Sequence, residues 1–319
     1  MWKTILRRIL IMIPELIVLS ILVFLLAKAM PGDPFTGSIN PKSNPAEIHR
    51  LMKANGLFDP WYVQYWHWVV NLFHGNLGMS YEYQMPVVDL IKQRGMNTLW
   101  LAAFTMILTY AIGLPLGIYA GKKEGKWPDT LIRIYTYVTM SIPFFVVLVI
   151  GIWIFGYALG WFPTSGSVSP SVSGLGPTLL SRLGHIILPG LLGALFGTVN
   201  IIQYLRSQVI DSKHSAFVKT EIAKGVPTKA IYRHHIFRNS VLPIAAFAGY
   251  SITGLLTGSI FTEMIFSYPG MGQLFLNAVN FRDYTVITTL VLLYGFLNLL
   301  GTLISDIVLS IVDPRIRIE

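Results

Sequence analysis

Acidic side chains, which could carry protons or bind cations, are rare within the apolar stretches of this 319-residue chain. Glu15 and Asp306 lie inside such stretches, and Glu263 lies at the end of another. An ionisable residue inside a membrane is by default a functional hypothesis. Glu15 and Asp306, however, are expected near the ends of their stretches, where water or an arginine or lysine partner can stabilise them. So few acidic residues disfavour a proton relay or an ion pathway.

Sites for metals, nucleotides and covalent catalysis are also not indicated. The chain has no cysteine, which excludes disulfides and cysteine-ligated metals. It lacks the glycine spacing of a phosphate-binding P-loop, so it does not bind ATP by that motif. His234 and His235 are adjacent, and neighbouring residues of a helix point about 100° apart, which does not make an i, i+4 ligand pair. We therefore expect no catalytic residue, no metal and no cofactor in this chain.

The composition is that of a helical membrane protein. Hydrophobic residues make up 53% and charged residues 12%, with a mean hydropathy of +0.59, whereas soluble domains carry about 25% charged residues. The apolar residues form runs of about 20, the length that crosses a bilayer as a helix. We predict an all-α polytopic protein with six transmembrane helices, at residues 9–29, 98–120, 131–159, 184–204, 241–262 and 285–311.

The basic loops predict the orientation of these spans. The net charge of +9 could suggest a nucleic-acid partner in a soluble protein, but here the basic residues cluster in one set of loops, and we expect no nucleic acid. The set comprises the N-terminus, the connection 121–130, the loop 206–239 and the C-terminal tail. Because cytoplasmic loops are enriched in lysine and arginine, both termini are predicted to be cytoplasmic. Cleavage of the first apolar run as a signal peptide would leave five spans, but that run is longer than a signal peptide needs.

The predicted spans divide the chain into three regions. Residues 1–97 hold the first span and an extracytoplasmic segment, residues 98–311 hold a five-helix core, and residues 312–319 form a cytoplasmic tail. In the first region, Trp61, Tyr65, Trp68 and Leu72 recur on one helical face. This face either lies on the bilayer surface or packs on the protein's own helices. Residues 160–183, rich in serine, glycine and proline, predict a surface loop.

Small and polar residues within the spans indicate close packing and a polar path. Glycines recur every four residues at Gly113, Gly117 and Gly121, at Gly193 and Gly197, and at Gly254 and Gly258. Such stripes let helices approach closely, either within the bundle or at a seam with a second subunit. Polar residues either join helices by hydrogen bonds or line a path for a hydrated solute. The candidates for the path are Asn200, Gln203, Ser251, Thr253, Thr257 and Asn298.

The basic loop has a pattern that predicts two short helices. Ser215 can cap a helix over 216–224, Gly225 can end it in a left-handed turn, and Pro227 prevents its continuation. Thr228 can cap a second helix to about residue 239. The apolar anchors would be Phe217, Ile222, Val226, Ile231 and Ile236. A short amphipathic helix with a basic rim can fit a groove on a partner protein or rest on anionic lipid.

This loop resembles the EAA loop of ABC importer permeases. Its KTEIAKG…RHHIFRNSVLP is similar to the peptide-permease branch, although lysine and threonine replace the first Glu and Ala of the general pattern and the Leu-Pro comes several residues late. Further similar stretches follow in order along nearly the whole chain: MPGDP, LFDPWYVQ, GNLGMS, GWFPTSG, EMIFSYPGMG and Arg282-Asp283-Tyr284. Together they resemble the B-type transmembrane subunit of the oligopeptide and dipeptide permease family.

The resemblance implies a type I ABC importer permease fold and several partners. These are a homologous C-type permease subunit, two ABC ATPases that bind ATP and Mg²⁺, an extracytoplasmic peptide-binding protein and the lipid of a bacterial or archaeal cytoplasmic membrane. The implied ATPase-coupling residues are Phe217, Lys219, Thr220, Glu221, Ala223, Lys224, Gly225, Arg233, His235, Arg238, Asn239 and Pro243. The implied docking residues for the binding protein are Glu263, Pro269, Gly270, Gly272, Arg282 and Asp283.

The expected function is therefore import of oligopeptides or dipeptides by alternating access. Nickel and glutathione importers belong to the same family and remain alternatives. A stand-alone secondary transporter is the alternative from another class. An intramembrane enzyme would need a paired polar constellation at depth, which the sequence does not show, and a scaffold would use the basic loop only to bind lipid.

Overall fold

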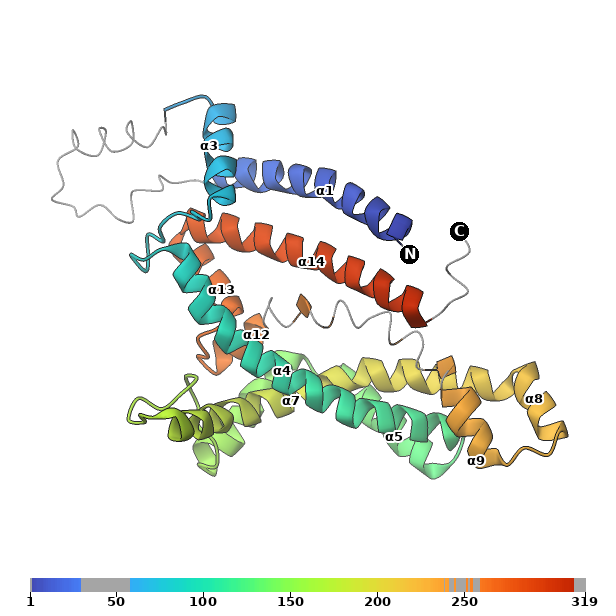
Figure 1. Cartoon of the computed structure of the whole chain (residues 1–319). Coiled ribbons are helices and arrows are strands. Elements are labelled where there is room, and N and C mark those ends of the chain that lie inside the picture. Colours follow the sequence, from blue (N-terminus) through green and yellow to red (C-terminus); the bar gives the residue numbers. More distant parts are fainter. Residues whose placement is uncertain are drawn as a thin grey trace.

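The computed structural model describes residues 2–29, 58–237, 239, 240, 244, 251, 253, 254 and 259–312. Within them the chain is helical, apart from loops and one isolated bridge between Met79 and Pro86 (Figure 1). The elements are α1 (Trp2–Ala29), α3 (Trp61–Phe73), α4 (Val87–Lys122), α5 (Trp127–Ser141), α6 (Phe144–Gly151), the π-helix η1 (Ile152–Ala158), α7 (Leu175–His214), α8 (Ala216–Ala223), α9 (Thr228–Ala230), the π-helix η2 (Ile231–Ile236), α12 (Ile260–Ile265), α13 (Met271–Phe281) and α14 (Tyr284–Val312).

Four of these helices are long and apolar enough to cross a membrane. They are Ile5–Ala29, Val87–Lys122, Leu175–His214 and Tyr284–Ile311. The expected span 131–159 is not one straight helix, because α5 and α6–η1 meet at an angle of 95°. The proline ring of Pro143 disfavours a helical residue before it, and Ile142 is extended. If this bent pair is one span the described spans number five, and the expected span 241–262 lies mostly outside the described residues.

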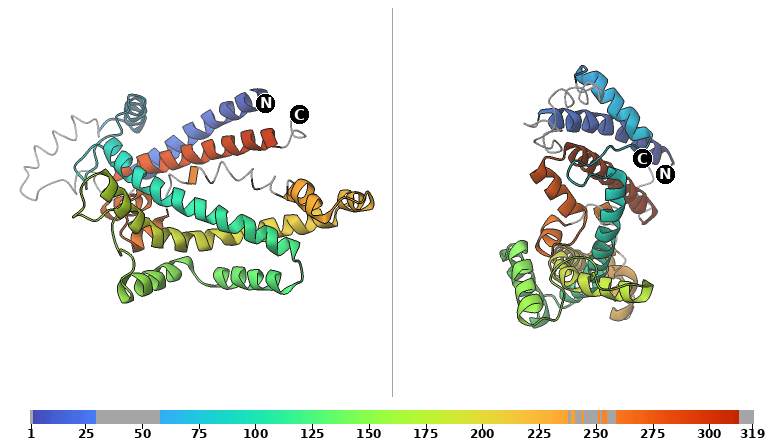
Figure 2. Two further views of the ribbon diagram at one scale, coloured as in Figure 1. Left: turned by 60° about the horizontal axis from the view of Figure 1, so that its bottom comes forward. Right: turned by 90° about the vertical axis from the view of Figure 1, so that its left-hand side faces the viewer.

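Helices α4 and α7 run along each other (Figures 1 and 2). Their glycines lie at the contact. On α4, Gly113, Gly117 and Gly121 are buried. Their facing residues on α7 are Ile201, Leu205 and Val209. In return, Gly193 and Gly197 of α7 meet Thr105 and Thr109 of α4. These two stripes therefore pack within this chain and do not form a seam with a second subunit. The third stripe is described only at Gly254.

Helices α1 and α14 form a second pair, which α3 crosses at one end (Figure 1). The ring centroid of Phe24, on α1, lies 5.5 Å from that of Tyr65 and 5.8 Å from that of Trp68, both on α3. The aromatic face of α3 thus packs on the protein's own helix. At the other end of the pair, Arg8 Nε lies 2.8 Å from Asp306 Oδ2, the partner expected for this acidic residue.

The bundle has two distinct ends. The start of α1, the end of α14 and the α8–α9 region lie at one end, which we call the α8 end, and α12 and α13 lie toward the other, the α12 end (Figures 1 and 2). The predicted surface loop 160–183 is shorter than expected, because α7 begins at Leu175. Its forty residues carry the chain along the bundle to the start of α8.

Gly117→Leu should destabilise the protein by about 1–3 kcal/mol, the usual cost of overpacking a core. A β-carbon at Gly117 would lie 3.0 Å from Leu205 Cβ and 3.2 Å from the backbone of Ile202. Thermal unfolding of the purified chain in detergent measures the effect. The control is Gly184→Leu in α7, where a β-carbon meets no atom within 4 Å. Equal destabilisation by both substitutions would contradict packing at the α4–α7 contact.

Candidate functional site

Helix α8 is a separate short helix at the end of α7, as the loop pattern predicted. Ser215 lies between them, at the C-cap position of α7 and the N-cap position of α8. Its side chain does not cap α8, because Ser215 Oγ donates to the carbonyl oxygen of Ser212 at 2.5 Å. The change of direction therefore comes from the extended backbone of Ser215, with φ −69° and ψ 157°.

Gly225 ends this helix in the left-handed conformation, at φ +78°. That conformation favours glycine over residues with a β-carbon. Pro227 then occupies the cap position before α9, so Thr228 is the first helical residue and not the cap that we expected. The second helix continues as the π-helix η2.

One face of α8 is fixed to the bundle and the other is exposed. Val218 is 4% exposed and belongs to an apolar cluster with Leu205 and Val209 of α7 and Ile231 and Ile236 of η2. The last two were expected as anchors for a partner, but they are buried in this chain's own core. The exposed residues of α8 and of the turn that ends it are Ala216, Phe217, Lys219, Thr220, Ile222, Ala223, Lys224 and Gly225.

The structure describes only some of the remaining residues predicted to couple the chain to an ATPase. Glu221 is half-buried and its Oε1 lies 3.2 Å from Lys224 Nζ. Arg233 and Asn239 are exposed. Arg238, Pro243 and the side chain of His235 lie outside the described residues.

Two acidic residues hold the α4–α5 turn against the end of α7. Glu124 Oε2 lies 2.9 Å from Lys213 Nζ and 3.1 Å from His214 Nε2. Asp129, which is fully buried, accepts hydrogen bonds from Arg206 Nε at 2.6 Å and from Arg206 Nη2 at 2.9 Å. Paired and hydrogen-bonded, a buried carboxylate can be tolerated. The segment that leads into α8 is thus fastened to the neighbouring turn.

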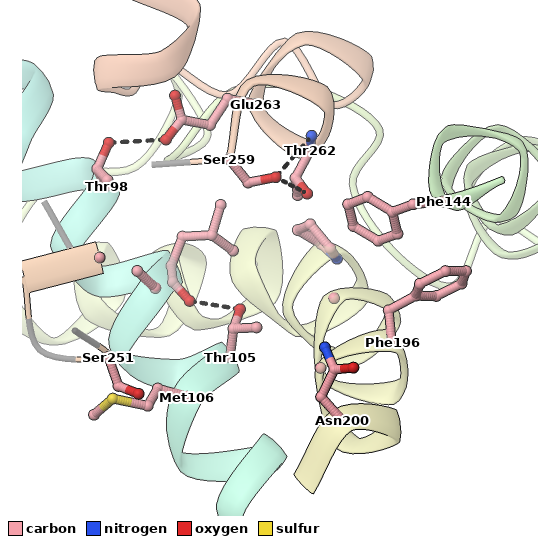
Figure 3. Close-up of a pocket in the computed structure, with 16 residues that line it drawn as sticks. Thr98, Thr105, Met106, Phe144, Phe196, Asn200, Ser251, Ser259, Thr262 and Glu263 are labelled. Carbon is pink, nitrogen blue, oxygen red and sulfur yellow. Dashed lines mark hydrogen bonds between the residues drawn. The ribbon is translucent and has the colours of Figure 1, made fainter. Parts of the chain in front are cut away.

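A cavity of about 520 Å³ lies among α4, α6, α7 and α12 (Figure 3). A second hollow of about 560 Å³ adjoins it and shares Met106, Gly197, Asn200 and Ser251. The first extends to Glu263 and the second to Gln203 and Tyr204. The two hollows form one path along α4 and α7. Its lining is mostly apolar with neutral polar groups, and the acidic Glu263 lies at its α12 end.

Three of the six residues predicted for a path are brought together here. Asn200 of α7 lines both hollows, Ser251 also lines both, and Gln203 of α7 lines the second. Thr253 is 7% exposed and lines neither, and Asn298 is exposed on α14, which contributes no residue to either hollow. Thr257 lies outside the described residues.

Sequence reasoning did not identify the residues of α4 that line the path. This helix presents Thr98, Thr105, Thr109 and Tyr110 to the two hollows. Tyr110 Oη lies 2.9 Å from Ser251 Oγ, which joins α4 to the far wall. Threonines at 98, 105 and 109 recur at helical spacing in the sequence, and that spacing was the available signal.

The glycines at the α12 end make room for a buried carboxylate. Glu263 is fully buried, and its oxygens accept hydrogen bonds from Thr98 Oγ1 and from the Gln273 backbone N, both at 2.9 Å. A β-carbon at Gly270 would overlap the Glu263 carboxyl group, and one at Gly272 would lie 3.1 Å from its Oε2. The carbonyl oxygen of Pro269 accepts from Asn97 Nδ2 at 2.9 Å. This network lies at the α12 end of the path, where Thr98 and Glu263 line the first hollow.

A second buried carboxylate fastens the turn before α14. Asp283 is 1% exposed and accepts from Ser80 Oγ at 2.5 Å and from the Val286 backbone N at 3.2 Å. Arg282 beside it is exposed and left-handed at φ +56°. Of the charged residues predicted to dock a binding protein, only Arg282 has an exposed side chain. Glu263 and Asp283 can serve docking only by shaping the loops.

These features define a class of protein. Long apolar helices surround a neutral polar path, an exposed short helix stands at one end, and the described residues hold no group of three or more side chains that could bind a metal. The arrangement suits a membrane subunit that passes a solute and contacts a partner.

Comparison with known families identifies that class more closely. Residues 113–318 match the family described as the binding-protein-dependent transport system inner membrane component, and residues 1–103 match its N-terminal membrane component. The chain belongs to this family of ABC importer permeases and has its type I fold. It is a non-catalytic, multi-pass membrane subunit of an importer complex.

Two relatives are similar over almost the whole chain. The oligopeptide transport system permease protein AppB of Bacillus subtilis (strain 168) is 35% identical over 314 residues, which cover 98% of each chain. The glutathione transport system permease protein GsiC of Escherichia coli (strain K12) is 33% identical over 318 residues, which cover 99% of each chain. The similarity to the peptide-permease family that the motifs indicated is confirmed.

Glu124→Gln should lower the stability of the purified chain at neutral pH by roughly 0.5–1 kcal/mol, as expected for a partly exposed ion pair. Hydrogen bonds from Lys213 and then His214 lower the pKa of the Glu124 carboxyl below its ordinary 4.5. The stabilisation is therefore complete above that pH and disappears as the pH falls through the lowered pKa. Unfolding of wild type and variant across pH 3–7 measures it. Glu82→Gln, at an exposed side chain of the α12 end, is the control, and a difference that persists at the lowest pH would contradict the ion pair.

Proposed function

We propose that this chain is the permease subunit of an ATP-driven importer of oligopeptides or dipeptides. The observation that carries the proposal is the exposed face of α8, held at the end of a forty-residue helix that also lines the path. Because α7 both ends at α8 and lines the solute's route, it carries a movement of α8 into the membrane. The full-length similarity to an oligopeptide permease supports the substrate class.

The proposed complex contains several other subunits. A homologous C-type permease would complete the path, and two ABC ATPases, which bind ATP and Mg²⁺, would receive the α8 face. An extracytoplasmic peptide-binding protein would dock at the α12 end. The α8 end then lies in the cytoplasm of a bacterium or archaeon, because the basic residues of 122–126 and 213–233 gather there.

The contacts that join α8 and the α4–α5 turn to α7 suggest how ATP binding changes access to the path. Closure of the ATPases on ATP would displace α8, and the Val218 cluster would transmit that displacement to α7. The Glu124 and Asp129 contacts would carry the α4–α5 turn with it. Access to the hollow between α4 and α7 would then change sides. Such a change needs ATP to bind one conformation more tightly than the other.

The lining of the path fits a peptide better than an ion. Neutral donors and acceptors at Asn200, Gln203 and Ser251 can pair with amide groups, and apolar surface surrounds them. The glutathione permease relative keeps a short, modified peptide as a specific alternative. A nickel importer has no feature of the described path in its favour.

Transport by the reconstituted complex tests this function. The chain, copurified with its C-type partner and ATPases, should take up labelled di- or oligopeptides in proteoliposomes only when ATP and the binding protein are present. Glutathione and Ni²⁺ serve as competing substrates. Uptake of either in place of peptide would overturn the peptide assignment, and ATP-independent flux through the chain alone would establish a secondary transporter.

Gly225→Asp should reduce peptide uptake about tenfold or more, equivalent to roughly 1.4 kcal/mol of coupling, without loss of membrane insertion or of ATP hydrolysis. The substitution places a β-carbon and a negative charge on the exposed face at φ +78°. Uptake and hydrolysis are measured in the same proteoliposomes. Gly160→Asp is the matched control, since Gly160 is also left-handed at φ +64° with no atom near its β-carbon position. Wild-type uptake by the Gly225 variant would remove the coupling role.

A further inference from the structure

A small hollow on the side of the bundle shares Gln203 with the path but is otherwise lined by different residues. It lies between α5 and α7 near the α8 end and has a volume of about 170 Å³. Two arginines, Arg133 of α5 and Arg206 of α7, line it together with Tyr137 and Gln203. Arginine is the side chain best suited to a phosphate, because its planar group donates two parallel hydrogen bonds.

The charges around this hollow do not balance. Arg206 uses Nε and Nη2 to bind the two oxygens of Asp129, so its Nη1 edge takes no part in that contact. Arg133 Nε lies 3.8 Å from the same carboxylate, too far for a hydrogen bond. Asp129 also accepts from the Gly125 backbone N at 3.0 Å. Two guanidinium groups thus share one carboxylate that already has its hydrogen bonds.

Arg133 in particular has an unmet donor. Its Nε is buried and, among the described residues, has no hydrogen-bond partner. A buried donor without a partner costs free energy, because it has lost its hydrogen bond to water. An anion in the hollow would satisfy this donor and would neutralise the surplus positive charge.

The surroundings of the hollow are those of a membrane interface. The outward face of α5 exposes Leu131, Ile134 and Val138, which suits lipid chains. Trp127, at the start of α5, is also exposed, and tryptophan concentrates where the bilayer meets water. Basic pockets between membrane helices on the cytoplasmic side bind anionic lipid headgroups.

We propose that this hollow binds the phosphodiester of an anionic phospholipid, with Arg133 and the Nη1 edge of Arg206 as its donors. The assignment to the cytoplasmic leaflet rests on the orientation given under the proposed function, whereas the site itself does not. A bound headgroup would sit beside the Asp129–Arg206 bridge and so support the junction of the α4–α5 turn with α7.

Lipid retention by the full-length chain tests the site. The purified protein is titrated with phosphatidylglycerol or phosphatidylcholine at high ionic strength, which screens exposed charges, and bound lipid is counted by native mass spectrometry. Phosphatidylglycerol should bind preferentially, and Arg133→Gln should weaken it about tenfold or more, the loss of a charge-assisted hydrogen bond. Lys126→Gln removes an exposed charge from the same end and should change binding by less than about twofold.

Two further arms keep the result decisive. Ile132→Trp retains every charge but fills the hollow, which Ile132 lines, and should also abolish the preference. Inorganic phosphate should not displace the lipid.

The proposal fails if Arg133→Gln binds phosphatidylglycerol as the wild type does, if Lys126→Gln loses as much binding as Arg133→Gln, or if phosphatidylcholine binds as well as phosphatidylglycerol. Displacement by phosphate would assign the site to a soluble anion, and absence of the lipid from the assembled transporter would assign the hollow to a partner subunit. Peptide uptake is not needed for any of these readouts.

Discussion

Helices α4 and α7 touch along glycines, and the rest of the structure is arranged around that contact. Each glycine removes a side chain, so the facing residues of the other helix come within ordinary packing distance of backbone. The contact fixes how both helices are rotated about their axes. As a result Asn200 and Gln203 of α7 and the threonines of α4 face the two adjoining hollows of the path. It also holds α7 against α4, and α8 follows α7 after the extended backbone of Ser215.

Buried acidic residues fasten both ends of this pair. Glu263 and Asp283 hold the loops at the α12 end, and Asp129 holds the α4–α5 turn at the α8 end. A buried carboxylate is costly unless its oxygens are hydrogen-bonded, so each one restricts the segments that supply its donors. Between these fastened ends the described part of the path is lined by apolar and neutral polar groups, and no ion pair joins described residues there. This division suits a subunit in which force enters at one end and access changes in the middle.

The α8 region combines a fixed base with an exposed face. Val218 is buried with η2, whereas Phe217 and Ile222 project outward at 38% and 61% exposure. An apolar side chain in solvent gains free energy when a partner covers it. Next to this region lies the α4–α5 turn. The ion pairs of Glu124 and Asp129 and the hollow lined by Arg133 surround that turn. Partner and lipid would therefore act on one junction from two sides.

Local properties of the chain were sufficient to determine the helical class, most of the spans, the α8 helix and its end at Gly225. A span is set by a run of apolar residues that satisfies its own backbone, and a left-handed turn is set by a single glycine, so both can be predicted from neighbouring residues. The motifs likewise identified the family. Only the tertiary structure decided the 95° bend at Pro143, the burial of Ile231, Ile236, Glu263 and Asp283, and the inclusion of Asn200 but not Asn298 in the path. Each of these depends on how a helix is rotated against partners distant in sequence, and that rotation is fixed by packing rather than by local pattern.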